Sequence, residues 1–465
     1  MPPSDANVYP ALSHASLISF MPGRSSSFVW RGPLYAGLEF ATLSTTEFQS
    51  MMSLQFPMYC FRVAGLKKLD KSFLPDAGLE AAIELLREVP SKRKILPEGF
   101  PESGFGELET LELLAPYVLG GAAKLDDPKS FAHMDPPTPW ITWATSLWNA
   151  RLNQNLLHHE TGPFALEAEK RVINWLAPYF GMEGGHMCSG STLANLTALW
   201  AARESGGVEK VVAFDTAHLS IVKASKILGL PIEIIESDSE DKIIRKKIGD
   251  LSNACLVLTA GTTKTGVIDD LSLVGSAKWT HVDGAWAGPL RFSRKHSQLL
   301  DGIEKADSVS VSAHKWLFQP KESALILFKN NEAATKEISF GGEYMSSPNI
   351  GVQGSRGASA VSLLATIIAW GREGIAHCID LAMSNSEKFA IEVQKSERIS
   401  LWAFPQTGVT VFRPVDLSTR DFMATLPSGM FSSCNFGHET WVRSVAANPM
   451  TDIEQVLRIV KKVLR

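Results

Sequence analysis

One lysine stands at the end of a short apolar run, where its chemistry differs from that of a surface lysine. The run SVSVSA (residues 308–313) alternates as a strand does, and His314, Lys315 and Trp316 follow it. A lysine at a strand end beside large apolar residues is partly desolvated, which lowers the pKa of its amine and makes it a nucleophile. The structural alternative is a surface lysine whose stem lies along the apolar rim.

A carboxylate closes the apolar run that precedes this lysine. The segment WTHVD (residues 279–283) ends in Asp283, which places that carboxylate at the carboxyl end of a neighbouring strand. Ligands of open α/β sheets collect outside those ends, so we expect Asp283 and Lys315 to face one crevice. A carboxylate there can keep a pyridine nitrogen protonated. The structural alternative for Asp283 is an ordinary helix N-cap.

Two further segments at predicted strand ends carry polar residues. Ser191 and Thr192 begin a helical segment, whose first N–H groups and positive dipole end suit a phosphate. The Walker and GxGxxG patterns are missing, so no nucleotide is implied. His218 follows the run VVAF (residues 211–214), and its imidazole can stack on an aromatic ring and transfer protons near neutral pH. Simple helix capping is the alternative for both segments.

The elements that must position these residues are short apolar runs alternating with helical stretches. This alternation predicts an α/β fold with a mostly parallel central sheet flanked by helices. The helical stretches include residues 192–204 and 219–228. The predicted strands are residues 211–214, 232–235, 254–260, 279–283, 308–313 and 323–328.

Three regions follow from this pattern. Residues 1–115 are punctuated by proline and glycine and contain one helical stretch at 76–88, so we expect an N-terminal arm. Residues 116–375 form the predicted large ligand-binding domain. Residues 376–465 hold the apolar run TGVTVFRP and a final helix from Thr451, which predicts a small C-terminal α+β domain.

The composition restricts the class of partner. The chain has 465 residues, of which 45% are hydrophobic and 20% charged, and a net charge of −4, which argues against disorder and against a nucleic-acid footprint. Five cysteines without metal or CxxC spacing predict reduced thiols and a cytoplasmic location. The apolar stretch at 361–370 is half the length of a membrane crossing, so we expect no membrane partner. A small molecule is the expected ligand.

Taken together, the segments resemble the group II amino-acid decarboxylases, which depend on pyridoxal 5′-phosphate (PLP). That family includes the aromatic amino acid, histidine, glutamate, cysteine sulfinate and diaminobutyrate decarboxylases. The resemblance runs from about residue 130 to the C-terminus and implies a fold type I PLP enzyme. It rests on FAHMDPP, CSGSTLANLTALWAARE, DTAHLSIVKA, TAGTTKTGVIDDL, HVDGAWAG, SAHKWLF, GSR and WVRSVAANP, in this order.

The resemblance implies a role for each matching residue. Lys315 is expected to hold the cofactor as a Schiff base, Asp283 to pair with the ring nitrogen and His218 to stack on the ring. Family members are active as homodimers, so the neighbouring chain is expected to supply part of the site. The other implied cofactor contacts are Ser191, Thr192, Ser312 and His314 at the phosphate, Ala285 and Thr262 near the ring, and Ser355 and Arg356 from the neighbouring chain.

Two departures from the family pattern concern one contact with the cofactor and the residue that donates a proton. Ser312 and Ala313 stand where the family has Asn or Asp followed by Pro, which weakens one expected phosphate or backbone contact. The loop between Lys315 and Arg356 is shorter than in aromatic decarboxylases, where a mobile tyrosine protonates the intermediate. Tyr344 is the tyrosine available in this loop, and it is our predicted proton donor with His218 as the substitute.

The implied activity is decarboxylation of an L-amino acid to its amine and CO2. The segment WVRSVAANP favours an acidic substrate of the aspartate, glutamate or cysteine sulfinate type, or a diamino acid, with Arg443 pairing with a carboxylate. Arg443 as a purely structural residue is the alternative. His133, Asn153 and Gln154 are further expected substrate contacts. Other PLP reactions (oxidative deamination, transamination, aldol cleavage) and a silent binding paralogue stay open.

Overall fold

The computed structural model describes residues 77–342 and 348–464. The chain divides into two compact units, Met1–Gly120 and Gly121–Arg465. The described part of the first unit contains helix α2 (Ala77–Arg87), where residues 76–88 predicted a helix, and most of helix α3 (Glu107–Gly121), which the sequence analysis did not predict.

A seven-stranded sheet forms the centre of the second unit. The order of its strands is β1-β7-β6-β5-β4-β2-β3, and β2 to β6 run parallel to one another. β7 is antiparallel to both β6 and β1, so the sheet is mostly parallel, as predicted. Its strands are β1 (Gly184–Cys188), β2 (Lys210–Phe214), β3 (Ile232–Ile235), β4 (Ala254–Thr259), β5 (Trp279–Asp283), β6 (Ser308–Ser312) and β7 (Ala324–Phe328).

Both faces of this sheet are buried, which explains why its central strands are continuous apolar runs. In β4, Leu256 and Leu258 belong to the hydrophobic core on one face, and Cys255 and Val257 belong to the core on the other. Each fully buried side chain of this size contributes about 1.5–3 kcal/mol to stability. The sheet is therefore a rigid frame for the loops at its edges.

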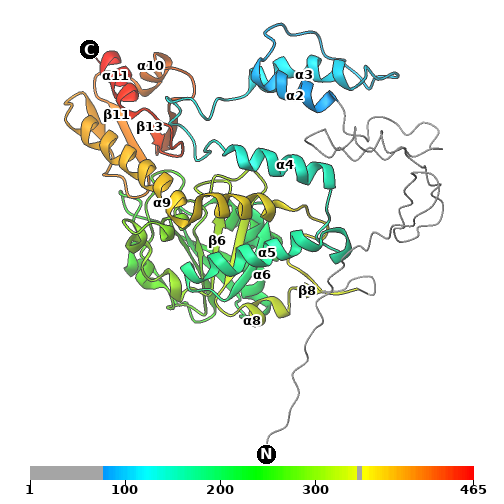
Figure 1. Cartoon of the computed structure of the whole chain (residues 1–465). Helices are drawn as coiled ribbons and strands as arrows, with labels where there is room; N and C mark the ends of the chain where they lie inside the picture. The colour runs from blue at the N-terminus through cyan, green and yellow to red at the C-terminus, as the bar shows by residue number, and fades with distance from the viewer. Residues whose placement is uncertain (1–76, 343–347, 465) are drawn as a thin grey trace, which may run out of the picture. The chain divides into compact units, whose positions relative to one another are not determined.

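Helices cover the sheet, and the figures show their arrangement. α6 packs against β6 and β7, and α5 packs against β1 (Figure 1). Pro163 occupies the first turn of α5, where its missing N–H costs nothing, and Gly229 ends α7 in a left-handed conformation with φ 68°. These helices are α4 (Trp140–Leu152), α5 (Pro163–Leu176), α6 (Ser191–Glu204), α7 (Leu219–Leu228) and α8 (Asn331–Lys336).

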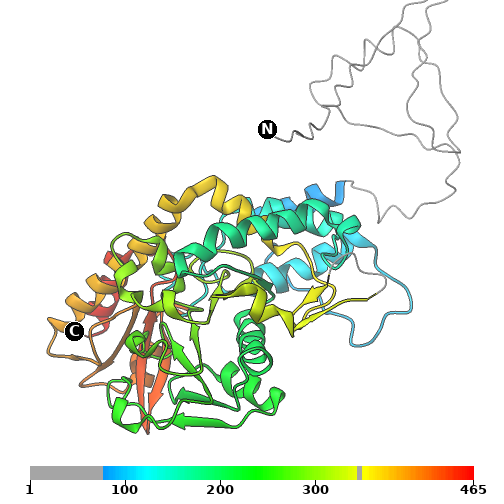
Figure 2. The same cartoon turned by 90° about the horizontal axis from the view of Figure 1, so that it is seen from below.

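The long helix α9 (Ser359–Gln394) connects the seven-stranded sheet to the C-terminal strands. It is broken at Gly371, whose φ of 61° and ψ of −177° are not helical. α9 packs against α4 and α5 on one side of this break (Figure 2). On the other side it packs against β10 (Ile399–Leu401), β11 (Val409–Pro414) and α11 (Ile453–Val463).

The C-terminal strands form a four-stranded antiparallel sheet of order β10-β11-β13-β12. The run TGVTVFRP supplies β11, and the predicted final helix is α11, which Asp452 caps. The elements of this part are β10 (Ile399–Leu401), β11 (Val409–Pro414), α10 (Thr419–Ala424), β12 (Ser432–Phe436), β13 (Glu439–Val445) and α11 (Ile453–Val463).

Short elements complete the described chain. The strands β8 (Ser339–Phe340) and β9 (Asn349–Ile350) form a separate two-stranded ribbon. Within residues 77–342 and 348–464, no helix is both long and apolar enough to cross a membrane. The 3₁₀ helices are η2 (His159–Thr161), η3 (Ala177–Phe180), η4 (Arg245–Lys247), η5 (Leu271–Leu273), η6 (Gly288–Phe292), η7 (Ser297–Leu300) and η8 (Ile303–Lys305).

Candidate active site

The predicted site residues gather at one edge of the seven-stranded sheet. β1 runs in the same direction as β6, because both pair antiparallel with β7. The carboxyl ends of β1, β2, β4, β5 and β6 therefore meet at the same edge, which is where open α/β sheets bind ligands. Ser191, His218, Thr262 and Lys315 follow four of these strand ends, and Asp283 is itself the last residue of β5.

Asp283 is a buried carboxylate, only 3% exposed. Its Oδ2 accepts a hydrogen bond of 2.9 Å from Asn195 Nδ2, and its Oδ1 accepts one of 3.1 Å from the backbone N–H of Ala285. The Ser310 hydroxyl lies 3.4 Å from the same Oδ1. These donors are uncharged, so they fix the carboxylate without neutralising it, and the bond from Ala285 shows that Asp283 also caps its own turn.

Lys315 follows β6 and is half-buried. Burial lowers the pKa of its amine, while the carboxylates of Asp283 and Asp135 act in the opposite direction. The neighbouring Trp316 is fully buried, and its indole N–H donates to the carbonyl of Ala446 at 3.2 Å. This anchor holds the end of β6, so Lys315 lies in a partly desolvated place rather than along an open rim.

The start of α6 has the features of an anion site. Ser191 Oγ lies 2.5 Å from Ser312 Oγ, so the ends of β1 and β6 present two hydroxyls at one point. No side chain caps α6 at Gly190, and a Cβ added at that glycine would meet no atom within 4 Å. Uncapped N–H groups beside open space are what a phosphate requires. Thr192 is exposed in the first turn of the same helix.

His314 lies beside Lys315 and is half-buried. Burial and the nearby charges of Lys321 and Lys315 lower the pKa of His314 to about 4. Its Nδ1 is buried and has no hydrogen-bond partner among the residues that the structure describes. An imidazole nitrogen in this state is available to a polar group of a ligand.

His218 is the N-cap of α7, so the capping alternative describes its geometry correctly. Its Nδ1 accepts the backbone N–H of Ser220 at 3.2 Å and lies 2.8 Å from the Ser220 hydroxyl. Burial lowers the pKa of His218, with the Asp283 carboxylate opposing this shift. The cap uses only Nδ1, so it is compatible with a role for the rest of the ring.

Comparison with known proteins identifies the family. A protein-family model described as the pyridoxal-dependent decarboxylase conserved domain matches residues 90–415. The chain belongs to this family. An aromatic-L-amino-acid decarboxylase of Bacillus atrophaeus is 26% identical over 420 residues, which cover 80% of this chain and 88% of the relative. An L-2,4-diaminobutyrate decarboxylase of Rhizobium meliloti (strain 1021) is 30% identical over 351 residues, with coverages of 68% and 70%.

A solved structure of similar fold agrees with this assignment. The crystal structure of mouse CSAD superimposes with a TM-score of 0.73 at 22% identity and covers 84% of this chain and 98% of its own. This pyridoxal-dependent decarboxylase is therefore a PLP-dependent carboxy-lyase of α/β fold that acts on an amino acid.

The residues at the sheet edge fit PLP group by group. Lys315 offers a desolvated amine to an aldehyde, and Asp283 offers a buried carboxylate to a protonated ring nitrogen. The uncapped start of α6, the paired hydroxyls of Ser191 and Ser312 and the unpartnered Nδ1 of His314 suit the phosphate. Within the described ranges, no group of three or more His, Cys, Asp or Glu residues is arranged to hold a metal ion.

Two predicted ring contacts have local structural explanations. Ala285 is buried, and its N–H holds Asp283. Thr262 is fully buried; its hydroxyl lies 3.0 Å from Thr265 Oγ1 and accepts the N–H of Val267 at 3.2 Å. The Thr262 hydroxyl thus closes the turn after β4, and contact of either residue with the cofactor stays a prediction.

Arg356 has a partner within its own chain, which the sequence analysis did not foresee. Its guanidinium makes a two-pronged ion pair with Glu169 of α5, in which Nη2 donates to Oε1 at 2.9 Å. Ser355 is exposed and accepts a hydrogen bond of 3.2 Å from Asn155 Nδ2. Contacts of both residues with a phosphate in a neighbouring chain stay a prediction.

Arg443 of β13 is 7% exposed, and the structural alternative accounts for part of its guanidinium. Nη1 donates to the carbonyl of Ala132 and to the Ser432 hydroxyl, both at 3.2 Å. Nε is buried without a partner among the described residues. Trp316, next to Lys315 in the chain, donates to the carbonyl of Ala446, three residues beyond Arg443, so the end of β13 lies beside the segment that holds Lys315, and the charge of Arg443 lowers the pKa of Lys315.

The other predicted substrate contacts are less enclosed. His133 is exposed, next to the Asp135–Lys321 ion pair, and its charge acts on the carboxylate of Asp135. Asn153 is exposed at the C-cap of α4, where its left-handed φ of 45° explains an asparagine. Gln154 is half-buried. Tyr344 lies outside the described residues.

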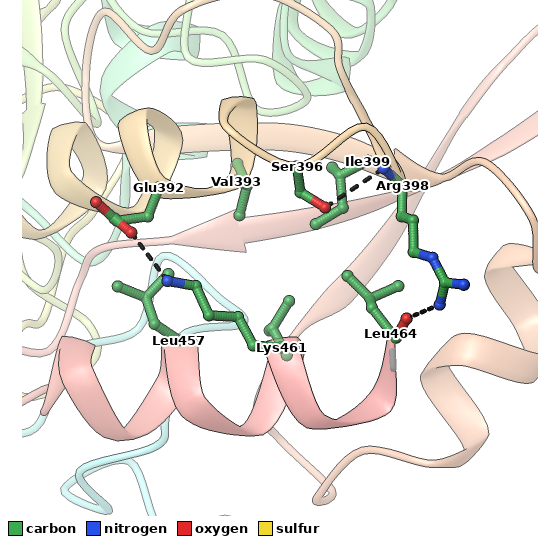
Figure 3. Close-up of a pocket in the computed structure, with 9 residues that line it drawn as sticks. Glu392, Val393, Ser396, Arg398, Ile399, Leu457, Lys461 and Leu464 are labelled. Atoms are coloured by element: carbon green, nitrogen blue, oxygen red, sulfur yellow. Dashed lines mark hydrogen bonds and ion pairs between the residues drawn. The ribbon is translucent and has the colours of Figure 1, made fainter.

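A pocket of about 340 Å³ lies elsewhere, between the C-terminal end of α9 and α11 (Figure 3). Its apolar lining includes Val393 and Leu457. Charged side chains that line it are bonded to other groups of the protein. Glu392 accepts from Lys461 at 2.9 Å, and Arg398 donates to the carbonyl of Leu464. None of the residues predicted for the cofactor lines this pocket.

Proposed function

We propose that the enzyme decarboxylates an L-amino acid with a charged side chain, acidic or diamino. The observation that carries this proposal is Arg443, a buried guanidinium near Lys315 whose Nε has no partner among the described residues. A buried unpartnered donor on a cation favours a carboxylate ligand, because charge-assisted hydrogen bonds compensate for its desolvation.

The polar groups around Lys315 support a charged substrate over an aromatic one. Asp135 and Lys321 form an ion pair whose two charges both act on the pKa of Lys315, and His133 stands beside them. A charged substrate side chain can join these polar groups through charge-assisted hydrogen bonds, which an aromatic side chain cannot form. The relative from Rhizobium meliloti is named for a diamino acid, which agrees with this expectation.

Bound PLP supplies an electron sink for the pair released when the Cα carboxylate leaves as CO2. The residues of the chain have separate tasks in this account. Lys315 supplies the amine that carries the cofactor, and Asp283 holds a proton at the ring nitrogen. Arg443 orients a substrate carboxylate. His218 stacks on the ring of the cofactor and leaves its Nε2 free, since its Nδ1 is used by the cap of α7, and Tyr344 stays the predicted donor of the proton that Cα takes up.

The test is a panel of amino acids assayed for CO2 release. Aspartate, glutamate, cysteine sulfinate and 2,4-diaminobutyrate are expected to exceed phenylalanine and tryptophan in kcat/KM. Arg443→Gln is expected to raise KM more than it lowers kcat, and Arg443→Lys to recover part of the loss. An aromatic amino acid as the best substrate contradicts the proposal. Aldehyde and ammonia as products would indicate oxidative deamination instead.

We also propose that the enzyme is a homodimer whose interface includes α4. Trp140, Trp143 and Trp148 of this helix are exposed, Trp140 by 70%, and Leu147 and Leu152 add to the same apolar surface. Exposed apolar groups of this size mark interaction surfaces in soluble proteins. A second copy of the chain packed on α4 would remove these apolar side chains from water. Such a dimer is consistent with a site completed by Ser355 and Arg356 of a neighbouring chain.

The proposed location is the cytoplasm, where thiols stay reduced. Cys188, Cys255, Cys378 and Cys434 are all free, and burial raises the pKa of each thiol, which keeps it unreactive. Cell fractionation with an activity assay tests this location; activity confined to a secreted or membrane fraction contradicts it.

A further inference from the structure

We propose that Asn195 is a positioning residue that joins Asp283 to His218, because its amide holds the carboxylate and directs the Ser220 hydroxyl to Nδ1 of His218. The inference rests on the proposed roles of Asp283 and His218. It concerns a residue of α6 whose amide bonds to residues of the strands β5 and β6.

Asn195 is fully buried in a helix whose other buried residues are nearly all apolar. Each of its polar atoms has partners. Nδ2 donates to Asp283 Oδ2 and to the Ser220 hydroxyl, both at 2.9 Å. Oδ1 accepts from Ser310 Oγ at 2.6 Å and lies 3.1 Å from His281 Nε2. One amide therefore connects two strands with the cap of α7.

The chemistry of these partners fixes the direction of every bond. An ionised carboxylate only accepts, so the atom facing Asp283 must be the NH2 group, and the carbonyl must face His281. His281 then carries its proton on Nε2. Its Nδ1 lies 2.9 Å from the Ser308 hydroxyl, which in turn accepts the indole N–H of Trp279 at 3.0 Å. Burial lowers the pKa of His281 to about 4, in keeping with a neutral ring.

The second N–H of Asn195 determines the direction in which the Ser220 hydroxyl donates its hydrogen bond. Because Ser220 Oγ accepts from Asn195, its own hydrogen is free to point to His218 Nδ1. The backbone N–H of Ser220 points to the same nitrogen. Two donors on Nδ1 leave it unprotonated, so the proton of the neutral ring is on Nε2. This is the nitrogen that the cap leaves free for the substrate.

Removal of the amide would leave several buried groups without partners at once. Among the residues that the structure describes, Asp283 would lose the one hydrogen bond to its Oδ2, and His281 would lose the acceptor of its Nε2. A misdirected Asp283 holds the ring nitrogen of the cofactor less firmly. The loss of a hydrogen bond to a charged group predicts PLP binding weaker by about ten- to a hundredfold.

The first test is PLP affinity of the full-length chain, titrated by absorbance. Asn195→Leu keeps the size of the side chain and removes the polar atoms, whereas Asn195→Asp keeps the shape and places a second carboxyl against Asp283, with which Asp283 must share a proton. The matched control is Thr197→Val on the same helix, because Thr197 is buried and its hydroxyl bonds to the carbonyl of Leu193 and the thiol of Cys188 rather than to Asp283 or His218. We expect both Asn195 variants to bind PLP at least about tenfold more weakly and the control to stay within about twofold. Equal losses in all three variants would overturn the inference.

The second test begins with the wild-type chain. In the full-length chain with ¹⁵N-labelled histidine, we expect the His218 signal to show a protonated Nε2 and an unprotonated Nδ1. In Asn195→Leu the Ser220 hydroxyl loses its donor, so we expect the ¹⁵N shift of His218 Nδ1 to change while the backbone N–H of Ser220 keeps this nitrogen unprotonated. A wild-type His218 protonated at Nδ1 overturns the inference.

The outcomes also separate this inference from the proposed function. If Asp283→Asn leaves PLP affinity unchanged, the role proposed for Asp283 is wrong. If Asp283→Asn weakens PLP binding while both Asn195 variants and the His218 signal stay as in the wild type, only the role of Asn195 is wrong.

Discussion

Ser191 Oγ lies 2.5 Å from Ser312 Oγ, although 121 positions separate the two serines in the chain. The contact exists because β1 and β6 end at the same edge of the sheet, with β7 between them. It joins the start of α6 to the residue two positions before His314. The uncapped helix end and the segment that holds Lys315 are thereby kept together.

Replacing one of these serines tests the phosphate site. Ser312→Ala removes one of the two hydroxyls, and we expect PLP to bind about three- to tenfold more weakly, the value of one ordinary hydrogen bond. Ser225→Ala is the matched control, because Ser225 is equally buried and its hydroxyl donates to the carbonyl of Leu230, outside this site. Absorbance titration measures both. Equal affinities for the two variants would show that Ser312 does not bind phosphate.

Asp283 is expected to matter for both affinity and rate. Asp283→Asn keeps the shape but removes the charge, so the ring nitrogen loses the partner that keeps it protonated. We expect kcat to fall by about a hundredfold or more, comparable to the loss of one preorganised electrostatic contact. Steady-state kinetics at saturating PLP measures this. A variant with more than a tenth of the wild-type kcat would contradict the assignment.

His186 makes stability depend on pH. Burial, with the Arg356 charge nearby, lowers the pKa of His186 from 6.5 to about 3. Between these values the unfolded chain binds a proton that the folded chain does not. His186 therefore decreases stability as pH falls from 6.5 towards 3, by about 1.4 kcal/mol per pH unit, and has no such effect above 6.5.

The measurement is the free energy of unfolding by urea between pH 4 and pH 6. His186→Leu changes the packing at every pH by the same amount, but its slope of stability with pH should be smaller by about 1.4 kcal/mol per pH unit. His438→Leu, at an exposed histidine, is the control and should keep the wild-type slope. Identical slopes for the wild type and His186→Leu would show that His186 titrates normally in the folded protein.

The exposed tryptophans of α4 predict the oligomeric state. Trp143→Glu places a charge on the proposed interface, and we expect the mass from light scattering to shift from dimer to monomer, with loss of activity. Trp143→Phe keeps an apolar ring and should stay dimeric. If Trp143→Glu remains a fully active dimer, α4 is not at the interface.

The sheet and the strand-end residues were predictable, whereas the bonds among them were not. The runs ending at Asp283 and Ser312 are continuous and apolar because both faces of their strands are covered, and this pattern is visible in the sequence. β1 escaped prediction because GGHMC contains two glycines and no β-branched residue.

The role of Asn195 depends on partners that are distant in sequence. A polar residue on the apolar face of α6 is the signal that marks it, but Asp283 is 88 positions away and His281 is 86. The ion pair of Arg356 with Glu169 spans 187 positions and has no local pattern at all. Such contacts follow from the order of strands and the break in α9, which no short segment encodes.

The most direct measurement of the central assignment is the identity of the lysine that carries the cofactor. Reduction of the PLP-loaded protein with borohydride makes the link permanent, and digestion with mass spectrometry then locates it. The account predicts the reduced cofactor on the peptide that contains Lys315, and no label in Lys315→Ala. A label on any other lysine of the wild-type protein, or an unchanged label in that variant, would contradict it.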